Sequence, residues 1–254
     1  MSVLGSLLYG VANVFHPRML WLMLWPMLVS ITLWGTLALL LWTRLALWIA
    51  GVLRQGLESV GFLMGFNLAD ATLIGANVLL FLLFVPLVYL TALFILGLFG
   101  MQKMVDYVAS RSFPGLERRR GGGIAGSAWN AFFTLVGMVG LGVLSLPLWL
   151  IPPFWPLIPV AILAWANQRL LRYDALAEHA DAREMASLFR RRRGALYALG
   201  GLLALAAYVP IVGFFAPVVF GLGFIHYLLG ALASLRAPID AMRTKNWIES
   251  KSTP

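Results

Sequence analysis

Long runs of apolar residues, separated by short basic segments, dominate the chain. Met19 to Thr43 and Ala71 to Gln102 contain no charged residue, and each run exceeds the roughly 20 helical residues needed to cross a bilayer. These runs predict two transmembrane helices, over 19–53 and 71–102. As one helix, the second would extend about 48 Å at 1.5 Å per residue, so we expect it to tilt or protrude.

The N-terminal residues show a different pattern, because their apolar side chains recur at helical spacing. Val3 to Phe15 predicts an amphipathic helix, which at about thirteen residues is too short to span a bilayer. We therefore expect residues 1–17 to form an interfacial helix. Pro17 should end this helix and let the chain turn inward.

Prolines break two further apolar blocks. In residues 121–171 the prolines cluster near the middle and forbid one straight helix, which predicts helices from about Ile124 to Leu146 and from Pro156 to Leu171. Residues 194–235 break at their own prolines and predict a second hairpin. Each hairpin either crosses the bilayer twice or is re-entrant and buried against protein.

Polar and charged residues gather between these blocks. Gln55 to Asp70 predicts a loop, Lys103 to Arg120 a basic loop, residues 172–193 a basic surface helix and residues 236–254 a polar tail. Together, these elements predict an all-α integral membrane protein that forms a single membrane domain. It has an N-terminal interfacial helix, two long transmembrane helices and two proline-broken helical hairpins.

The composition excludes a soluble globular domain. Hydrophobic residues make up 61% of the 254 residues and charged residues 11%, against about 25% charged residues in ordinary soluble domains. The absence of cysteine excludes disulfides, thiolate catalysis and cysteine-ligated metals. No basic leader with a cleavage site precedes Met19, so we expect no cleaved signal peptide.

The formal charge of +9 predicts loops in contact with anionic lipid head groups rather than binding to nucleic acid. Lys and Arg number five in 103–120, seven in 169–193 and four in the tail. The positive-inside rule places these three regions on one side of the membrane. Because the number of crossings between them is even, we predict a bacterial-type inner-membrane protein with both termini cytoplasmic and the 44–70 connection outside.

Few residues suggest catalytic chemistry. The sequence contains no phosphate-binding loop, no His-Glu-x-x-His motif and no Gly-x-Ser-x-Gly motif, so we predict no enzyme, no cofactor and no metal centre. Glu178 beside His179 is either a metal or proton site or a solvated pair. His226 lies in the last apolar block, where a polar ring is either functional or interfacial.

Glycine and arginine runs each leave two interpretations open. The glycines at 121–123 form a plain hinge, or a cradle of backbone N–H groups for an anion at a helix start. Gly122 and Gly126 have the spacing that permits close helix packing. The arginines at 190–193 anchor the chain among head groups or contact a lipid phosphate or a substrate anion.

Arg18 is the only charged residue before Arg44. It follows Pro17 at the turn into the first transmembrane helix, near the positive end of that helix dipole. An entering oxyanion would meet both the guanidinium and the dipole. The alternative is a snorkelling arginine that marks the membrane boundary.

Three stretches carry a resemblance to a known family: Pro17 to Pro26, Leu171 to Tyr173 with the charged helix after it, and Tyr208 to Pro217. With the order of the helices, they resemble the CysZ-type sulfate permeases and the wider etoposide-induced-gene-homologue family. The resemblance implies hairpins that partly penetrate the membrane, homo-oligomeric assembly and sulfate uptake into the cytoplasm. We predict substrate contacts at Pro17, Arg18 and Tyr173.

In this family the first proline is followed by Gly-Leu-Arg-Arg, whose arginines are implicated in sulfate binding. Leu20 and Trp21 occupy those arginine positions here, and the nearest arginine is Arg18. Two hypotheses follow. The chain is a transporter or channel for a small inorganic anion, sulfate by resemblance, that works without ATP. Alternatively, it is a non-transporting membrane scaffold or lipid-interacting protein that keeps the family fold without the anion site.

Overall fold

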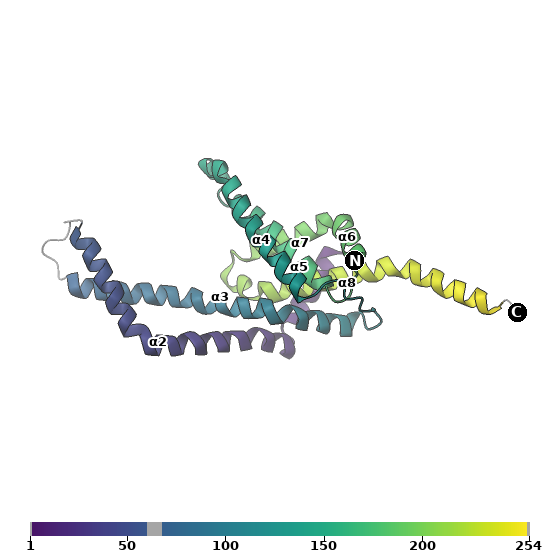
Figure 1. Ribbon diagram of the computed structural model, residues 1–254, viewed down its shortest axis with the longest axis horizontal. Helices are drawn as coiled ribbons and strands as arrows, with labels where there is room; N and C mark the ends of the chain where they lie inside the picture. Colours follow the sequence, from purple (N-terminus) through teal and green to yellow (C-terminus); the bar gives the residue numbers. More distant parts are fainter. Residues whose placement is uncertain (1, 60–67, 253–254) are drawn as a thin grey trace. The chain divides into compact units, whose positions relative to one another are not determined.

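The computed structural model describes residues 2–59 and 68–252, which are helical almost throughout. The α-helices are α1 (Val3–Val14), α2 (Pro17–Ser59), α3 (Leu68–Ser112), α4 (Ile124–Leu144), α5 (Leu157–Leu176), α6 (Ala182–Arg191), α7 (Arg193–Ala206) and α8 (Pro210–Ser252). Two short 3-10 helices, η1 (Leu146–Leu150) and η2 (Pro152–Phe154), join α4 to α5. No strand occurs in these described residues, which confirms the predicted all-α class (Figure 1).

Four helices of the described chain are long and apolar enough to cross a membrane. They cover Pro17–Glu58, Ala69–Gly97, Ala125–Leu144 and Val212–Pro238. By contrast, α1 has 12 residues and α7 has 14. At 1.5 Å per residue α7 is about 21 Å long, which is shorter than a hydrocarbon core of about 30 Å.

Several helices extend beyond the ends that the sequence predicted. The loop predicted from Lys103 is wrong over its first part, because α3 continues to Ser112. The loop predicted from Gln55 is helical as far as Ser59, and residues 60–67 lie outside the described part of the chain. Charged residues sustain a helix as well as apolar ones do once it leaves the membrane.

The basic surface helix predicted over 172–193 is shorter in the structure, where α6 begins only at Ala182. A capping box fixes this start. The Asp181 carboxylate accepts a hydrogen bond from the Glu184 backbone N–H (2.8 Å), and the Glu184 carboxylate accepts one from the Asp181 backbone N–H (2.9 Å). In the tail, predicted only as polar over 236–254, α8 continues to Ser252.

Both proline-broken hairpins occur, with one difference. The first turns through η1 and η2, where Trp155 Nε1 donates to the Trp149 carbonyl (2.7 Å). The second turns between Ala206 and Pro210, the first residue of α8. Pro217, predicted to take part in that break, lies inside α8.

Residues 21–100 form one compact unit, an antiparallel pair made by α2 and α3 (Figure 1). Two tryptophan N–H groups connect its helices. Trp34 Nε1 donates to Thr91 Oγ1 (2.9 Å), and Trp42 Nε1 donates to Asn77 Oδ1 (2.8 Å). Such interhelical hydrogen bonds stabilise helix pairs in lipid by about 1 kcal/mol each.

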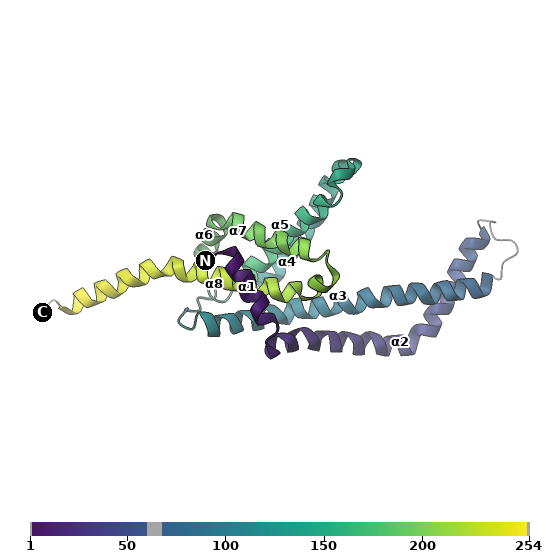
Figure 2. The ribbon, with the colours of Figure 1, turned by 180° about the vertical axis from the view of Figure 1, so that it is seen from behind.

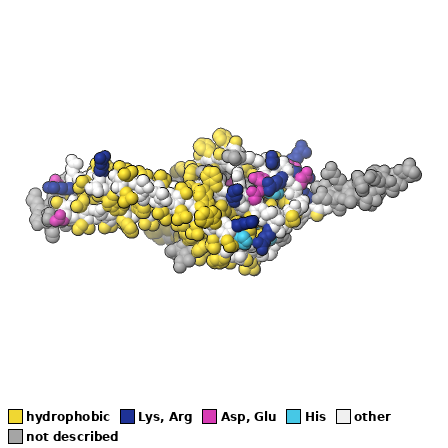
Figure 3. Space-filling view, turned by 90° about the horizontal axis from the view of Figure 1, so that it is seen from below, with side chains coloured by type: hydrophobic (Ala, Val, Ile, Leu, Met, Phe, Trp, Pro, Cys, Tyr) yellow, Lys and Arg dark blue, Asp and Glu magenta, His cyan; other side chains and the backbone are white. Residues whose placement is uncertain are grey.

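Large apolar side chains cover the surface of this pair. Leu39 is 91% exposed and Trp48 is 67% exposed, and Figure 3 shows hydrophobic surface with few charges along these helices. In water each such side chain would cost about 25 cal/mol per Å² of apolar area. The surface is therefore suited to lipid acyl chains.

Residues 1–20 and 101–254 form the other compact unit, which is built around α8. Its helix α8 is buried from Ala216 to Leu232 apart from a few intermediate positions and contacts α1, α5 and α7 (Figure 2). A Cβ added at Gly10 of α1 would collide with the carbonyl of Val219 in α8. Small residues thus set the closest approach of these helices, as in many membrane bundles.

Helix α1 points several of its apolar side chains outward. Leu4 and Leu8, with Phe15 just after the helix, are 59–68% exposed, whereas Ser6 and Val14 are buried. An amphipathic helix takes this orientation when protein satisfies its polar side and lipid meets its apolar side. The polar side of α1 is therefore part of the interior of the unit.

Candidate functional site

Pro17 and Arg18 lie at the start of α2, immediately after α1. His16 caps this start, since its carbonyl accepts from the N–H groups of Met19 (2.8 Å) and Leu20 (3.0 Å), and its Nδ1 accepts from the Arg18 N–H (3.3 Å). Pro17 has no N–H group. The first backbone donors of α2 therefore have partners, and an anion at this turn would depend on the Arg18 side chain.

A polar cluster beside this turn joins α1 to the end of α3. The Tyr107 hydroxyl donates to Asn13 Oδ1 (2.9 Å) and accepts from Arg111 Nη1 (3.1 Å). The Tyr107 ring centroid lies 5.2 Å from that of His16. We call Asn13, His16, Tyr107 and Arg111 the junction cluster. It brings a second cation, Arg111, to the helix junction that carries Arg18.

Neither cation is neutralised locally. Among the described residues, no carboxylate lies within ion-pair distance of Arg18 or Arg111. Both side chains are exposed, and Arg111 also lies over the Tyr107 ring (5.9 Å). A guanidinium without a carboxylate partner keeps its donors available for an oxyanion.

His226 of α8 extends the polar contacts of α1. Its ring stacks on Tyr9 at 4.1 Å, lies 5.7 Å from Phe113, and its Nδ1 is 3.3 Å from Ser6 Oγ. The Ser112 hydroxyl donates to the Tyr9 hydroxyl (3.1 Å). These contacts place the His226 ring against protein side chains, and a functional role for it stays a prediction.

Tyr173 lies in another part of the same unit, where α5 packs on the start of α4. A Cβ added at Gly126 would collide with the Tyr173 hydroxyl, and one at Gly122 would lie 3.0 Å from it. These contacts confirm close packing at the two glycines, Gly126 within α4 and Gly122 just before it. No contact in the described residues links Tyr173 to Pro17 or Arg18, so its role in substrate binding stays a prediction.

The backbone of the triple glycine at 121–123 makes hydrogen bonds to the segment after α5. Gly121 N–H donates to the Ala180 carbonyl and Gly122 N–H to the Ala177 carbonyl, both at 2.9 Å. Arg120, with a φ of 47°, turns the chain immediately before them. Because these two amides already have acceptors, the structure favours the hinge over an anion cradle.

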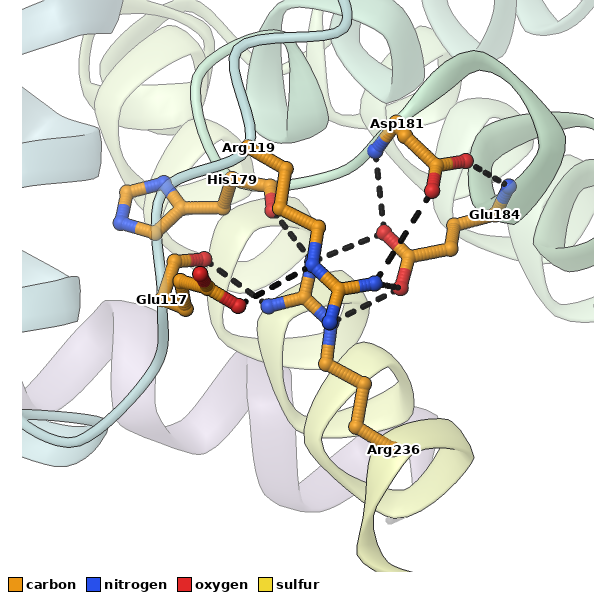
Figure 4. A network of polar contacts seen from close by, with 6 residues as sticks. All are labelled: Glu117, Arg119, His179, Asp181, Glu184 and Arg236. Atoms are coloured by element: carbon orange, nitrogen blue, oxygen red, sulfur yellow. Dashed lines mark hydrogen bonds and ion pairs between the residues drawn. The ribbon is translucent and has the colours of Figure 1, made fainter. Parts of the chain in front are cut away.

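A buried ion-pair network forms around Arg236, further along α8 (Figure 4). Arg236 is 4% exposed. Its Nε and Nη2 each donate to one carboxylate oxygen of Glu184 at 2.8 Å, and it also donates to the carbonyls of Glu117 (2.8 Å) and His179 (2.6 Å). Arg119 Nη1 adds a further contact to Glu184 (2.9 Å).

The charges of this network shift the pKa values of its members. The hydrogen bond from Arg236 holds the pKa of the Glu184 carboxyl below its usual range. Burial, with the positive charge of Arg118, lowers the pKa of His179. Glu178 forms an ion pair with Arg118 (3.5 Å), and no group of three metal-binding side chains occurs among the described residues.

The network joins the three most basic regions of the chain: the segment after α3, helix α6 and the start of the basic tail within α8. A groove of about 440 Å³ lies beside it. The residues that line the groove are Phe113, Gly115, Leu116, Glu117, Arg119, Ala233, Arg236 and Ala237. The sequence could not identify Arg119, Glu184 and Arg236 as partners, because the positions of charged residues along a chain do not specify which of them form ion pairs.

A family model described as Sulfate transporter CysZ/Etoposide-induced protein 2.4 matches residues 6–217. The chain belongs to this family. The match includes the junction cluster and Tyr173 and ends before Arg236. No curated protein and no solved structure matches the chain. With its apolar helices, family membership makes this chain a transporter-like, multi-pass membrane protein.

Proposed function

We propose that this chain moves a small inorganic anion, sulfate, across a bacterial-type inner membrane. The observation that carries the proposal is the match of residues 6–217 to a sulfate transporter family. The proposed entry contact is Arg18, with Arg111 as the second cation at the same junction. Assembly as a homo-oligomer belongs to the same proposal.

The chemistry of the junction supports an oxyanion as the ligand. Sulfate carries two negative charges, and guanidinium groups bind such oxygens through charge-assisted hydrogen bonds worth about 1.5–3 kcal/mol each. The family motif places its arginine pair at positions held here by Leu20 and Trp21. Arg18 and Arg111 come instead from two different helices, α2 and α3.

Sulfate uptake into proteoliposomes tests the proposal. We expect flux above that of empty vesicles, and a loss of about 10- to 100-fold in apparent affinity for Arg18→Ala and Arg111→Ala. Arg183→Ala, an exposed arginine of α6 without an ion pair, is the matched control. Flux equal to that of empty vesicles would refute transport, and unchanged affinity in both variants would remove the junction from the mechanism.

A second candidate function is a membrane scaffold that binds no anion. Leu20 and Trp21 at the arginine positions favour it, and the Trp21 side chain is 62% exposed. A native-state ligand raises the unfolding temperature by mass action. Unfolding temperatures of the wild type and Arg18→Ala in sulfate, sulfite and chloride at equal ionic strength decide between the functions, because only an anion site at the junction predicts a sulfate shift that Arg18→Ala reduces.

We also propose cytoplasmic termini, because the three basic regions meet in one network. The chain has no cysteine, so single introduced cysteines report topology cleanly. An impermeant maleimide should label Gln55→Cys in intact cells, but Ser2→Cys and Ser252→Cys only after permeabilisation. The reverse pattern would overturn this orientation.

A further inference from the structure

Arginines meet where α5, α6 and α7 come together. Helices α5 and α7 pack closely, since Asn167 Nδ2 donates to the Gly200 carbonyl (3.4 Å) and a Cβ on Gly200 would strike the Ala164 carbonyl. The two helices run antiparallel, so this register carries Arg172, near the end of α5, toward Arg193, the first residue of α7.

Aromatic side chains hold three guanidinium groups in this region. A cation over an aromatic face is stabilised by about 0.5–2 kcal/mol, more when water is excluded. The pairs are Arg169 over Trp165 (5.5 Å), Arg172 over Phe189 (4.5 Å) and Arg193 over Tyr197 (5.7 Å). Because each aromatic partner is neutral, the stacking orients the cations without cancelling their charge.

No carboxylate cancels these charges either. None of the three arginines forms an ion pair within the described part of the chain. The Nε of Arg169 is buried and has no hydrogen-bond partner. Burial, followed by the nearby charges of Arg169 and Arg193, lowers the pKa of Arg172, which lies outside the four candidate spans.

Such a cluster is costly when empty. Like charges at close range repel, and a buried donor without an acceptor loses its hydration without compensation. Elsewhere in the same unit, buried Arg236 has a carboxylate and two carbonyls. An anion would give the donors of Arg169, Arg172 and Arg193 the acceptors that Arg236 finds within the protein.

The position of the cluster indicates where that anion comes from. Arg193 begins the apolar helix α7, and the exposed arginines 190–192 come directly before it. Arginines at the end of an apolar helix lie at the depth of lipid head groups. The phosphate of a phospholipid is the oxyanion most abundant at that depth.

We propose that Arg169, Arg172 and Arg193 form a binding site for a tetrahedral oxyanion, supplied by the phosphate of an anionic phospholipid head group or by free phosphate. Planar guanidinium groups match the oxygens of such an anion in bidentate fashion. The site is separate from Arg18 and does not depend on the proposed transport.

The unfolding temperature of the full chain in uncharged detergent tests this site. Short-chain phosphatidylglycerol should raise it by about 5 °C at a hundredfold excess over Kd, whereas phosphatidylcholine should not. Arg172→Gln and Arg193→Gln should lose the shift, and Arg191→Gln, an exposed neighbour, should keep it. In a parallel series, inorganic phosphate replaces chloride at equal ionic strength. If phosphate gives the Arg172-dependent shift and the lipid does not, the site belongs to the free anion.

The variants without ligand separate binding from a structural role. Removing one of three like charges relieves repulsion but also removes the stacking on Phe189. These effects oppose each other, so Arg172→Gln should unfold close to the wild-type temperature when no anion is present. An unfolding temperature several degrees lower would assign Arg172 to structure and overturn the proposal. Absence of any shift with both anions, or equal loss in Arg191→Gln, would overturn it as well.

Discussion

Glu184 connects two arginines, so Glu184→Gln measures how far the Arg236 network stabilises its unit. The amide keeps the size of the side chain and an oxygen for the α6 capping box, but it loses the charge that faces Arg236 and Arg119. Side-chain exposure is 5% for Arg236 and 11% for Glu184. Removing one partner of a buried ion pair costs about 3–5 kcal/mol, because the other charge stays buried.

The assay is thermal unfolding in detergent, followed by tryptophan fluorescence. At about 2–4 °C per kcal/mol for a chain of this size, Glu184→Gln should unfold about 10 °C below the wild type. Glu117→Gln is the matched control, because the Glu117 side chain is 70% exposed in its pair with Arg119 and such pairs contribute about 0–1 kcal/mol. A Glu184→Gln variant that unfolds within about 2 °C of the wild type would refute the reasoning.

The pH dependence of stability provides a second measurement on the same variant. The hydrogen bond from Arg236 lowers the folded-state pKa of Glu184, so its contribution is complete above the unfolded pKa of about 4.3 and is lost as the pH falls through the lower folded value. The wild type should therefore approach Glu184→Gln in stability below about pH 4. A gap that stays constant as the pH falls well below about 4 would contradict an ionic origin.

Two further substitutions test packing and burial. Gly126→Ala places a methyl group against the Tyr173 hydroxyl and should cost about 1–3 kcal/mol, whereas Gly140→Ala, with open space around it, should be neutral or stabilising by up to about 1 kcal/mol; unfolding temperatures that shift equally would contradict this. Burial, with the positive charge of Arg118, lowers the folded-state pKa of His179, so wild-type stability should fall as the pH drops below the unfolded value of about 6.5. His179→Phe should flatten that slope in a series of unfolding temperatures, and an unchanged slope would exclude His179 as its source.

The helices of this chain could be predicted from its sequence because uncharged runs and prolines report directly on membrane crossings and breaks. The first helix of the 121–171 hairpin, predicted from Ile124 to Leu146, ends at Leu144. The end of α3 could not be predicted this way, since hydropathy marks where a helix leaves lipid and not where it stops. Lys103 to Ser112 are polar enough to suggest a loop and still form helix.

The candidate sites also differ in how far the sequence could predict them. Arg18 was visible because it stands alone in a charge-free stretch, whereas its neighbour Arg111 lies 93 positions away on another helix. Arg236 and Glu184 are 52 positions apart. Contacts of this kind depend on how helices pack, and no pattern along a single chain specifies the partner.

The family match ends inside helix α8 rather than between two helices. The match ends at Pro217, yet the fully buried side chains of Leu222, Phe224 and Leu232 come after it. A chimera that joins two family members at residue 217 would pair the outer helices of one protein with the central helix of the other. A chimera between relatives should therefore keep α8 in one piece and join the two sequences in the turn before Pro210.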